Sequence, residues 1–279
     1  NRFEDASYML YDSKKCLVAV CPACRISDTN VTVLFSHKGS TFGGLIIHKK
    51  YYCAHKVIAI IKAFEDGFVS EGYQKIVYKI TSDLFSKREC DLLEYCLYYS
   101  KYRNYDELNL YVDLNIKTCD VLSYFSQGKR TNVHNCEKKG LVVRPLRDDQ
   151  EIILFHKLLS DTLAKYELKP VHTSEELIAL KNHFISEECD FYGAFLDEKM
   201  IAGSMMFYFW DVKTAHTQYL CADHEYDKLS PMTYMYYSMM VKMQEKGFQR
   251  LSWGITSEHL GLELNYGLTR SKESFGSKY

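Results

Sequence analysis

Two segments that lie far apart in the chain read as variants of one sequence. Residues 71–81 are EGYQKIVYKIT and residues 246–256 are KGFQRLSWGIT. Gly, Gln, Ile and Thr coincide, and several other positions are conservative exchanges. Self-similarity of this kind indicates a repeated structural unit. We therefore infer two related units in tandem; the alternative is two unrelated strands that each follow a helix ending in glycine.

The same order of predicted elements surrounds both copies. A strand pair precedes each copy, SYMLYDSKKCLVAV turning at residues 12–15 and FYGAFLDEKMIAGSMM turning at residues 197–199. A third strand follows, VTVLFS at 31–36 and TAHTQYLC at 214–221. A helix then leads to the glycine of the repeated segment, where a helix readily ends. This shared order supports the repeat independently of the eleven matched residues.

The second unit contains the longer series of elements. A strand at 141–146 and a helix at 149–165 open it, and Thr173 with Glu176 forms a capping box that starts a second helix. Ser230 and Pro231 are typical of the start of the long helix. The first unit begins at the strand pair and lacks the opening strand and the two helices that precede this pair in the second unit. We therefore expect domains at 1–119 and 141–279, a connecting helix at 120–140, and a missing beginning of the first domain, since the chain starts at Asn1.

Composition excludes several classes of function. The 279 residues carry a formal net charge of −1, whereas proteins that bind nucleic acid over a wide surface are strongly basic. The longest apolar runs have the length of a strand, so we expect no membrane span. Ten cysteines are scattered along the chain, which indicates a reducing compartment and a cytoplasmic protein. Cys21 and Cys24 form one CxxC pair without a second pair, so we expect free cysteines and no metal, with a metal or redox role as the alternative.

The order of elements resembles the GNAT acyltransferase fold, and two such units in tandem resemble its FemABX-like branch. Four local sequences are similar to that branch: SHKGSTFGGL at 36–45, KPVHTSEEL at 169–177, AHTQYL at 215–220 and LNYGLTRSKESFG at 264–276. The resemblance implies an α/β (α+β) fold of two GNAT-like domains. Each domain would be a mixed, mostly antiparallel sheet flanked by helices.

The resemblance also implies a chemistry. GNAT enzymes pass an acyl group from an activated donor directly to an amine, so the protein positions the donor carbonyl and stabilises charge without a covalent intermediate. The donor would lie in a slot between residues 215–221 and 251–255. The family's CoA-using members hold pyrophosphate on a glycine-rich loop at the start of the long helix. Here that loop is ADHEYDKLSPM, which has no glycine and contains Asp223, Glu225 and Asp227.

Three carboxylates at this loop would repel a pyrophosphate, so the sequence argues against an ordinary CoA donor. We expect no permanently bound cofactor, and an acyl donor that acts as co-substrate, either aminoacyl-tRNA or acyl-CoA. The acceptor would be a small-molecule or peptide amine, such as a cell-wall precursor peptide. The alternatives are a CoA-dependent N-acetyltransferase of a small amine and a non-catalytic binding protein that retains the fold.

Candidate site residues follow from these segments. His216 can act as a base because its pKa lies near neutrality, and the resemblance makes Lys272 the best cation for an oxyanion. Strand alternation places His216 and Gln218 on one face and Tyr219 on the other. The other reading of each residue is structural: a hydrogen-bonded strand histidine and a solvated lysine. The candidate substrate-binding residues are His37, Lys38, Gly39, Thr41, Gly43, Gly44, Gln218, Tyr219, Ser230 and Gly254.

One basic cluster lies on the expected connecting helix. It contains Lys129, Arg130, His134 and Lys138, and positions 130, 134 and 138 share a face. We expect that any contact with tRNA or another phosphate ligand would be made here, although a run of charge is commonly a solvated face.

Overall fold

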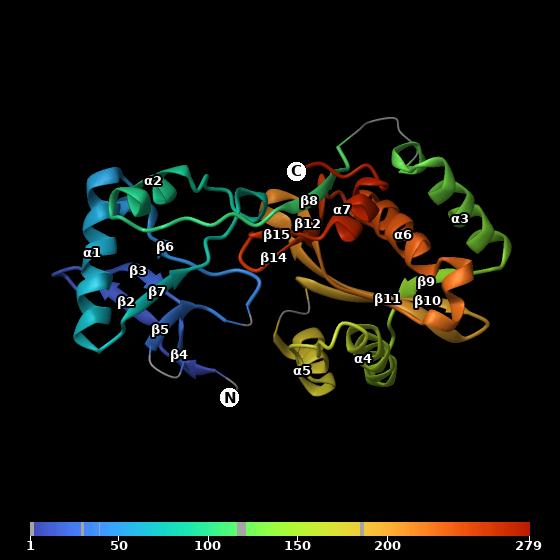
Figure 1. Cartoon of the computed structure of the whole chain (residues 1–279), viewed down its shortest axis with the longest axis horizontal. Coiled ribbons are helices and arrows are strands. Elements are labelled where there is room, and N and C mark those ends of the chain that lie inside the picture. The colour runs from blue at the N-terminus through green and yellow to red at the C-terminus, as the bar shows by residue number, and fades with distance from the viewer. Residues whose placement is uncertain (1–2, 29–30, 39, 116–120, 185–186) are drawn as a thin grey trace. The chain divides into compact units, whose positions relative to one another are not determined.

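A computed structural model describes residues 3–28, 31–38, 40–115, 121–184 and 187–279. The chain forms two compact units, Asn1–Asn104 and Tyr105–Tyr279 (Figure 1). Within the described residues, no helix is long and apolar enough to cross a membrane.

The first unit contains two small sheets and two main helices. One sheet has the order β1-β4-β5-β7 and is formed by Glu4–Asp5, Cys24–Asp28, Val31–Ser36 and Lys75–Tyr78. The other has the order β2-β3-β6 and is formed by Tyr8–Tyr11, Leu17–Cys21 and Ile46–Ile47. Helices α1 (Ala54–Ser70) and α2 (Asp91–Tyr99) contribute to one apolar core, with the short 3-10 helices η1 (Lys49–Tyr51) and η2 (Asp83–Phe85) beside them.

The chain leaves one sheet of the first unit and enters the other at the CxxC segment. β3 ends at Cys21 and β4 begins at Cys24, with Pro22 between them. Proline has no backbone N–H for a ladder, which explains why pairing breaks at this step. Both cysteines are free and buried, as expected. Burial raises the pKa of the Cys21 thiol to about 12, which makes it a poor thiolate.

The repeated segment has the same local geometry in both units. Gly72 follows α1 with a φ value of 83°, and Gly247 follows α6 (Pro231–Glu245) with a φ value of 86°. The next residue donates its backbone N–H five positions back, Tyr73 to the Phe68 carbonyl at 3.1 Å and Phe248 to the Met243 carbonyl at 3.0 Å. This is the glycine-terminated helix end that the two sequences predict. Both copies of the repeated segment therefore begin at a helix end of the same local geometry.

The second unit is built on a six-stranded sheet of order β8-β13-β12-β11-β10-β9. Its strands are Asn109–Asp113, Arg250–Ile255, Thr214–Ala222, Lys199–Phe209, Cys189–Leu196 and Val142–Pro145. The β10–β11 hairpin turns at Asp197 and Glu198, whose φ values of 46° and 65° suit a tight hairpin turn. All neighbours are antiparallel except β12 and β13. A separate hairpin is formed by β14 (Ser257–Glu258) and β15 (Glu263–Leu264).

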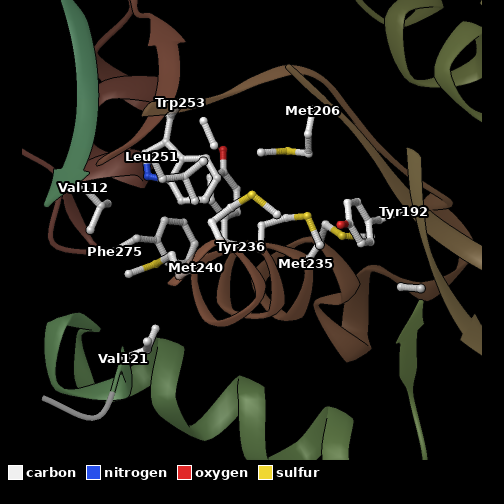
Figure 2. Packing of buried hydrophobic residues seen from close by; sticks show 14 of the residues in the cluster. Val112, Val121, Tyr192, Met206, Met235, Tyr236, Met240, Leu251, Trp253 and Phe275 are labelled. Carbon is white, nitrogen blue, oxygen red and sulfur yellow. The ribbon is translucent and has the colours of Figure 1, made fainter. Parts of the chain in front are cut away.

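Helices cover both faces of this sheet. α6 (Pro231–Glu245) and α3 (Gln127–Lys138) lie on one side, and α4 (Asp149–Ala164) and α5 (Ser174–Ala179) lie on the other (Figure 1). On the α6 side, Tyr236 packs against Trp253 and stacks on Phe275, which follows α7 (Tyr266–Glu273), with ring centroids 4.4 and 4.2 Å apart (Figure 2). On the α4 side, Phe155 packs against Phe191 in a second core. The short helices are η3 (Val121–Tyr124), η4 (Leu180–Phe184), η5 (Trp210–Val212) and η6 (His224–Leu229).

The second unit begins earlier than the sequence suggests. The expected first domain ended at residue 119, whereas the structure places the division between Asn104 and Tyr105. The reason is β8, which pairs with β13 and so completes the sheet of the second unit. The expected connecting helix is α3, which packs on α6 and belongs to the same unit.

Candidate active site

β12 and β13 separate from one another in the middle of the second sheet. They pair from Thr214 opposite Arg250 to His216 opposite Ser252. Within the described residues the β12–β13 pairing ends there, while β12 continues on β11 to Ala222 and β13 continues on β8 to Ile255. The two strands therefore form a V whose apex is His216 and Ser252. The V is formed by residues 215–221 and 251–255, the two segments between which we expect a donor to bind.

Each strand carries a bulge immediately beyond the apex. On β12, Thr217 pairs with Met206 and Tyr219 with Met205, so Gln218 is the additional residue. On β13, Ser252 and Gly254 pair with consecutive residues of β8, so Trp253 is the additional residue. A bulge leaves the backbone of its extra residue outside the regular ladder and bends the strand. Both strands therefore depart from regular pairing at the place where they separate.

The bulge changes the expected alternation along β12. Ala215 packs in the core on the α6 side, whereas Tyr219 packs against the core on the α4 side. His216 alternates with Ala215 and so lies on the α4 side together with Tyr219. The expectation that Tyr219 lies on the face opposite His216 is wrong, because the extra residue Gln218 shifts the alternation by one.

A hydrogen-bonded cluster occupies the apex of the V. Ser252 Oγ donates to Asn109 Oδ1 at 3.3 Å and accepts from the Gly254 backbone N–H at 3.2 Å. His216 Nδ1 lies 3.1 Å from the same Oγ. Because the single hydroxyl proton of Ser252 is directed at Asn109, Nδ1 of His216 must be the donor in this contact. A neutral His216 then carries its lone pair on Nε2, which is the state a proton acceptor requires.

Lys272 is buried at the end of β13. Its Nζ atom donates to three consecutive backbone carbonyls, those of Trp253 at 2.7 Å, Gly254 at 3.1 Å and Ile255 at 3.0 Å. Only 4% of the residue is exposed, and burial lowers the pKa of the ammonium to about 8. An ammonium has three N–H donors, so these carbonyls use all of them. Direct contact with a substrate oxyanion, as the sequence predicts, would require one of these bonds to break.

The loop before α6 forms the short helix η6. Asp223 accepts from the Glu225 backbone N–H at its start and forms an ion pair with Lys199 at 3.0 Å. Ser230 precedes α6 in the left-handed conformation, with φ of 60°, and its side chain makes no capping hydrogen bond. Pro231 follows and has no N–H to offer an anion. The start of α6 therefore differs from a glycine-rich phosphate loop in backbone as well as in charge.

A second polar cluster lies on the α4 side of β12. Tyr219 Oη lies 2.8 Å from His172 Nδ1, and His156 Nε2 of α4 lies 3.0 Å from the His172 backbone oxygen. A carbonyl can only accept, so His156 carries its proton on Nε2. The sequence alone indicates Tyr219 as a site residue, but it does not indicate His156 or His172. Their spacing along the chain gives no signal, because α4 and the following loop meet β12 only in the folded unit.

The glycine-rich loop of the first unit has close backbone contacts of its own. Ser36 Oγ accepts from the backbone N–H groups of Gly44 at 3.2 Å and Lys79 at 2.7 Å. A Cβ atom on Gly43 would overlap the Ser36 carbonyl, and Gly44 has φ of 88°. These contacts account for both glycines without a ligand. His37 and Thr41 are half-buried, Lys38 is exposed, and Gly39 lies outside the described residues. The two units are placed separately, so His37, Lys38 and Thr41 are not assigned to the slot.

The predicted basic cluster on α3 is not uniform. Lys129 is half-buried, lies 4.7 Å from the ring of Phe275, and has its pKa lowered by burial. Arg130 is half-buried, whereas His134 and Lys138 are exposed, and His134 lies 3.2 Å from Glu137. Contact of these four residues with RNA or phosphate stays a prediction.

Two groups of side chains in the described part of the chain have the spacing of metal ligands. They are Asp83 with Cys90 and Asp91, and Glu258 with His259 and Glu263. In the first, the Asp83 carboxylate already accepts from the Cys90 backbone N–H at 2.6 Å. The second is fully exposed on the β14–β15 hairpin. Neither group includes His216 or Ser252 of the apex.

Comparison with known proteins agrees with this geometry. Residues 127–260 match the family model described as an acetyltransferase (GNAT) domain. No curated protein sequence matches the chain. Among solved structures, the chain is similar to FemX, with 11% identity, a TM-score of 0.69, and coverage of 99% of this chain and 85% of that one.

Two further structures show the same arrangement over almost the full chain. L-PGS from Bacillus licheniformis has 13% identity and a TM-score of 0.65, with 96% of this chain and 80% of that chain covered. A tandem GNAT protein from the clavulanic acid biosynthesis pathway has 9% identity and a TM-score of 0.55, with 99% and 82% covered. At these identities the likeness establishes the fold. The expected fold of two GNAT-like units is thereby confirmed.

Proposed function

We propose that this chain, which belongs to the GNAT superfamily and has the tandem fold of its FemABX-like branch, transfers an activated acyl or aminoacyl group to an amine. The reaction would take place at the V between β12 and β13. The amine nitrogen attacks the acyl carbon, the bond from that carbon to the leaving oxygen or sulfur breaks, and no acyl-enzyme forms.

The observation that carries the proposal is the polar apex of the V. β12 and β13 stop pairing beyond the apex, each strand carries a bulge there, at Gln218 and at Trp253, and His216 lies within hydrogen-bonding distance of Ser252. Preorganised backbone N–H groups stabilise a developing oxyanion more effectively than water does. A neutral histidine with its lone pair on Nε2 can accept the proton that the attacking amine loses. A purely structural strand pair needs neither the bulges nor a buried polar cluster.

The start of α6 supports a donor other than CoA. Asp223, Glu225 and Asp227 add negative charge where the CoA-using pattern has glycines, and Pro231 removes one backbone N–H. Lys199 neutralises Asp223 and also lies 3.6 Å from Glu225, but Asp227 is paired only with His224 in the described contacts of this loop. A pyrophosphate would meet net repulsion here. We therefore propose aminoacyl-tRNA as the leading donor class.

The acceptor is proposed as an amine on a small molecule or on a peptide such as a cell-wall precursor. The structural likeness to FemX and to L-PGS supports aminoacyl transfer in general, and it leaves the acceptor of this chain as a proposal. If the donor is aminoacyl-tRNA, tRNA is a partner of this chain. Its candidate contact is the exposed part of α3, which contains His134 and Lys138.

A specific observation favours a second candidate, a binding protein that has lost the chemistry. Lys272 uses all three N–H groups inside the protein, and His216 is only 6% exposed. Both residues could therefore have a purely structural role. The two candidates differ in one measurable respect, because only the enzyme consumes a donor.

A donor panel tests the proposal directly. The whole chain would be incubated with acetyl-CoA or with a mixture of radiolabelled aminoacyl-tRNAs, each with lysine or a nucleotide-linked muropeptide as acceptor. We expect amide formation from aminoacyl-tRNA and none from acetyl-CoA. Transfer from acetyl-CoA alone would support the CoA-dependent alternative. Saturable binding without any amide product would support the binding protein and contradict the proposed function.

A further inference from the structure

The β14–β15 hairpin and the start of α7 carry a run of exposed apolar side chains. Five of the nine residues from 260 to 268 are large, apolar and exposed: Leu260, Leu262, Leu264, Tyr266 and Leu268. Leu262 is the most exposed of them, at 85%. Single exposed leucines are common on protein surfaces, whereas a run of this kind marks a surface that binds something apolar.

Two carboxylates lie among these apolar residues. Glu258 of β14 stands directly opposite Glu263 of β15, and like charges in a directly opposed pair destabilise a hairpin. Among the described residues, the ion pairs give Glu263 only His259, at 3.8 Å, and Glu258 accepts from the Asn265 side chain at 2.8 Å. A positively charged ligand would relieve the repulsion between the two carboxylates.

The hairpin is fixed to the rest of the second unit. The Thr256 backbone N–H donates to the Leu108 carbonyl at 2.8 Å, and the Leu108 N–H donates to Ser257 Oγ at 3.0 Å. At the turn, Gly261 has φ of 82°, and a Cβ atom there would overlap the Asp106 carbonyl oxygen. These contacts hold the apolar residues at the surface in one conformation, which lowers the entropy that binding would cost.

The hairpin continues from one arm of the V. The β12–β13 pairing ends at His216 and Ser252, β13 runs on to Ile255, and β14 begins at Ser257. An extended chain rises about 3.3 Å per residue, so the five steps from Ser252 to Ser257 cover at most about 17 Å. A peptide bound at the hairpin can therefore reach the apex with about five further residues.

We propose that the β14–β15 hairpin is the docking surface for the acceptor. The acceptor is a peptide with an apolar and positively charged segment, which binds the leucines and the Glu258–Glu263 pair while an amine about five residues away reaches the apex. This inference rests on the proposed function, since an acceptor has a role only if the chain transfers a group. The two carboxylates would repel phosphate groups, so this surface suits the acceptor and not a tRNA donor.

Three matched peptides test the proposed chemistry without any donor. They are the amides of Gly-Gly-Gly-Gly-Leu-Lys-Leu, Gly-Gly-Gly-Gly-Ser-Lys-Ser and Gly-Gly-Gly-Gly-Leu-Glu-Leu, titrated into the whole chain by isothermal calorimetry. The second peptide lacks the apolar side chains, and the third reverses the charge between them. We expect the first peptide to bind and each of the other two to bind at least about tenfold more weakly.

Variants at exposed positions locate the binding surface. Leu262→Ser should weaken binding of the leucine–lysine peptide about fivefold, and Glu263→Gln about twofold to fivefold, with a smaller dependence on salt concentration. Leu154→Ser and Glu188→Gln are the matched controls, because both residues are exposed and lie outside the hairpin. Circular dichroism would verify the fold, and substitutions at exposed positions such as these rarely destabilise it.

Transfer to the same peptide tests the acceptor role. With the donor that is active in the donor panel, Leu262→Ser should raise KM for the leucine–lysine peptide about fivefold and change kcat less than about twofold, because the leucine contributes to binding alone. Leu154→Ser should change neither constant.

The remaining outcomes separate this inference from the proposed function. Equal binding of the three peptides, or unchanged binding in Leu262→Ser, would overturn the docking surface. Loss of binding on addition of EDTA would also overturn it, because the carboxylates would then hold a metal ion. Transfer to free lysine without binding of the peptide would overturn the docking surface and leave the proposed function intact. Peptide binding without amide formation from any donor would contradict the proposed function, and the acceptor role with it.

Discussion

A Cβ atom on Gly254 would lie 3.6 Å from Cε1 of His216, which is ordinary van der Waals contact. The constraint at position 254 is therefore its backbone, whose φ of 78° disfavours every residue with a side chain. This conformation follows the bulge at Trp253 and directs the Gly254 carbonyl to Lys272 and its N–H to Ser252. One glycine thus links the His216 cluster to the Lys272 cluster.

The first prediction follows from this link. Gly254→Ala should lower the free energy of unfolding by about 1–2 kcal/mol, the cost of a left-handed backbone for an L-residue. Urea unfolding of the purified chain measures the change. Gly128→Ala is the matched control, because Gly128 lies in α3 with no atom near its missing Cβ, and alanine there should be neutral or stabilising. An equal effect of both substitutions would contradict the role of Gly254.

Lys272 should contribute to stability through its three carbonyl contacts. Lys272→Met removes the donors while keeping a long apolar stem, and we expect a loss of about 2–4 kcal/mol because buried carbonyls lose their partner. Lys278→Met is the control. Its ammonium is 55% exposed and pairs with Asp113, so removing it should cost about 0–1 kcal/mol.

The stability difference between wild type and Lys272→Met should depend on pH in a definite direction. Burial lowers the pKa of Lys272 to about 8 in the folded chain, whereas an unfolded lysine titrates near its model value of 10.5. Between these values the unfolded chain binds more protons than the folded chain, so the contribution of Lys272 to stability rises with pH. The difference between wild type and Lys272→Met should therefore widen from pH 8 to pH 10. A difference that narrows over this window would show that the ammonium, and not the amine, is the favoured folded form.

The ion pair between Arg144 and Glu151 lies at the other edge of the sheet. Its contribution to stability should be lost at acidic pH. Arg144 donates to both Glu151 oxygens at 2.9 and 2.7 Å, and the hydrogen bond from Arg144 lowers the pKa of Glu151. A carboxyl with a lowered folded pKa stabilises the fold above its unfolded pKa and loses that contribution as pH falls through the folded value. Glu151→Gln should thus cost about 1–3 kcal/mol at pH 7 and progressively less below pH 4 in urea unfolding. The exposed Glu188→Gln serves as control, and a cost that does not change with pH would contradict the ion-pair account.

Local sequence predicted those parts of the fold that depend on local contacts. The glycines of the repeated segment, the Asp12–Lys15 turn and the Thr173 capping box all involve residues a few positions apart, and the structure shows each of them. The difference between the loop before α6 and a glycine-rich phosphate loop was also visible in the sequence, from Asp223, Glu225 and Asp227. These features are decided by conformational preferences and nearby hydrogen bonds, which a short window of sequence contains.

The site depended on contacts that no short window contains. Asn109 reaches Ser252 only because β8 joins β13, and His172 reaches Tyr219 only because the loop after α4 lies on β12. The bulge at Gln218 is set by pairing with β11, and it reversed the predicted face of Tyr219 relative to His216. Ser252 was overlooked although it lies in the repeated segment. In the first unit Tyr78 occupies the place of Trp253, and Val77 that of Ser252, so the serine is a difference between the two copies.

Ser252 is the residue on which the apex depends most directly. Ser252→Ala would leave His216 Nδ1, Asn109 Oδ1 and the Gly254 N–H without their shared partner, and His216 would no longer be held in one tautomer. Loss of about 1–3 kcal/mol of buried hydrogen bonding corresponds to a fall of roughly 5-fold to 150-fold in kcat. Steady-state transfer with the active donor measures it. Ser160→Ala is the matched control, because that hydroxyl bonds only to the His156 carbonyl of its own helix in the described contacts, and we expect kcat to change less than about twofold. If Ser252→Ala retained full kcat while binding the donor normally, His216 would not be the proton acceptor, and the base would have to come from another residue of the slot.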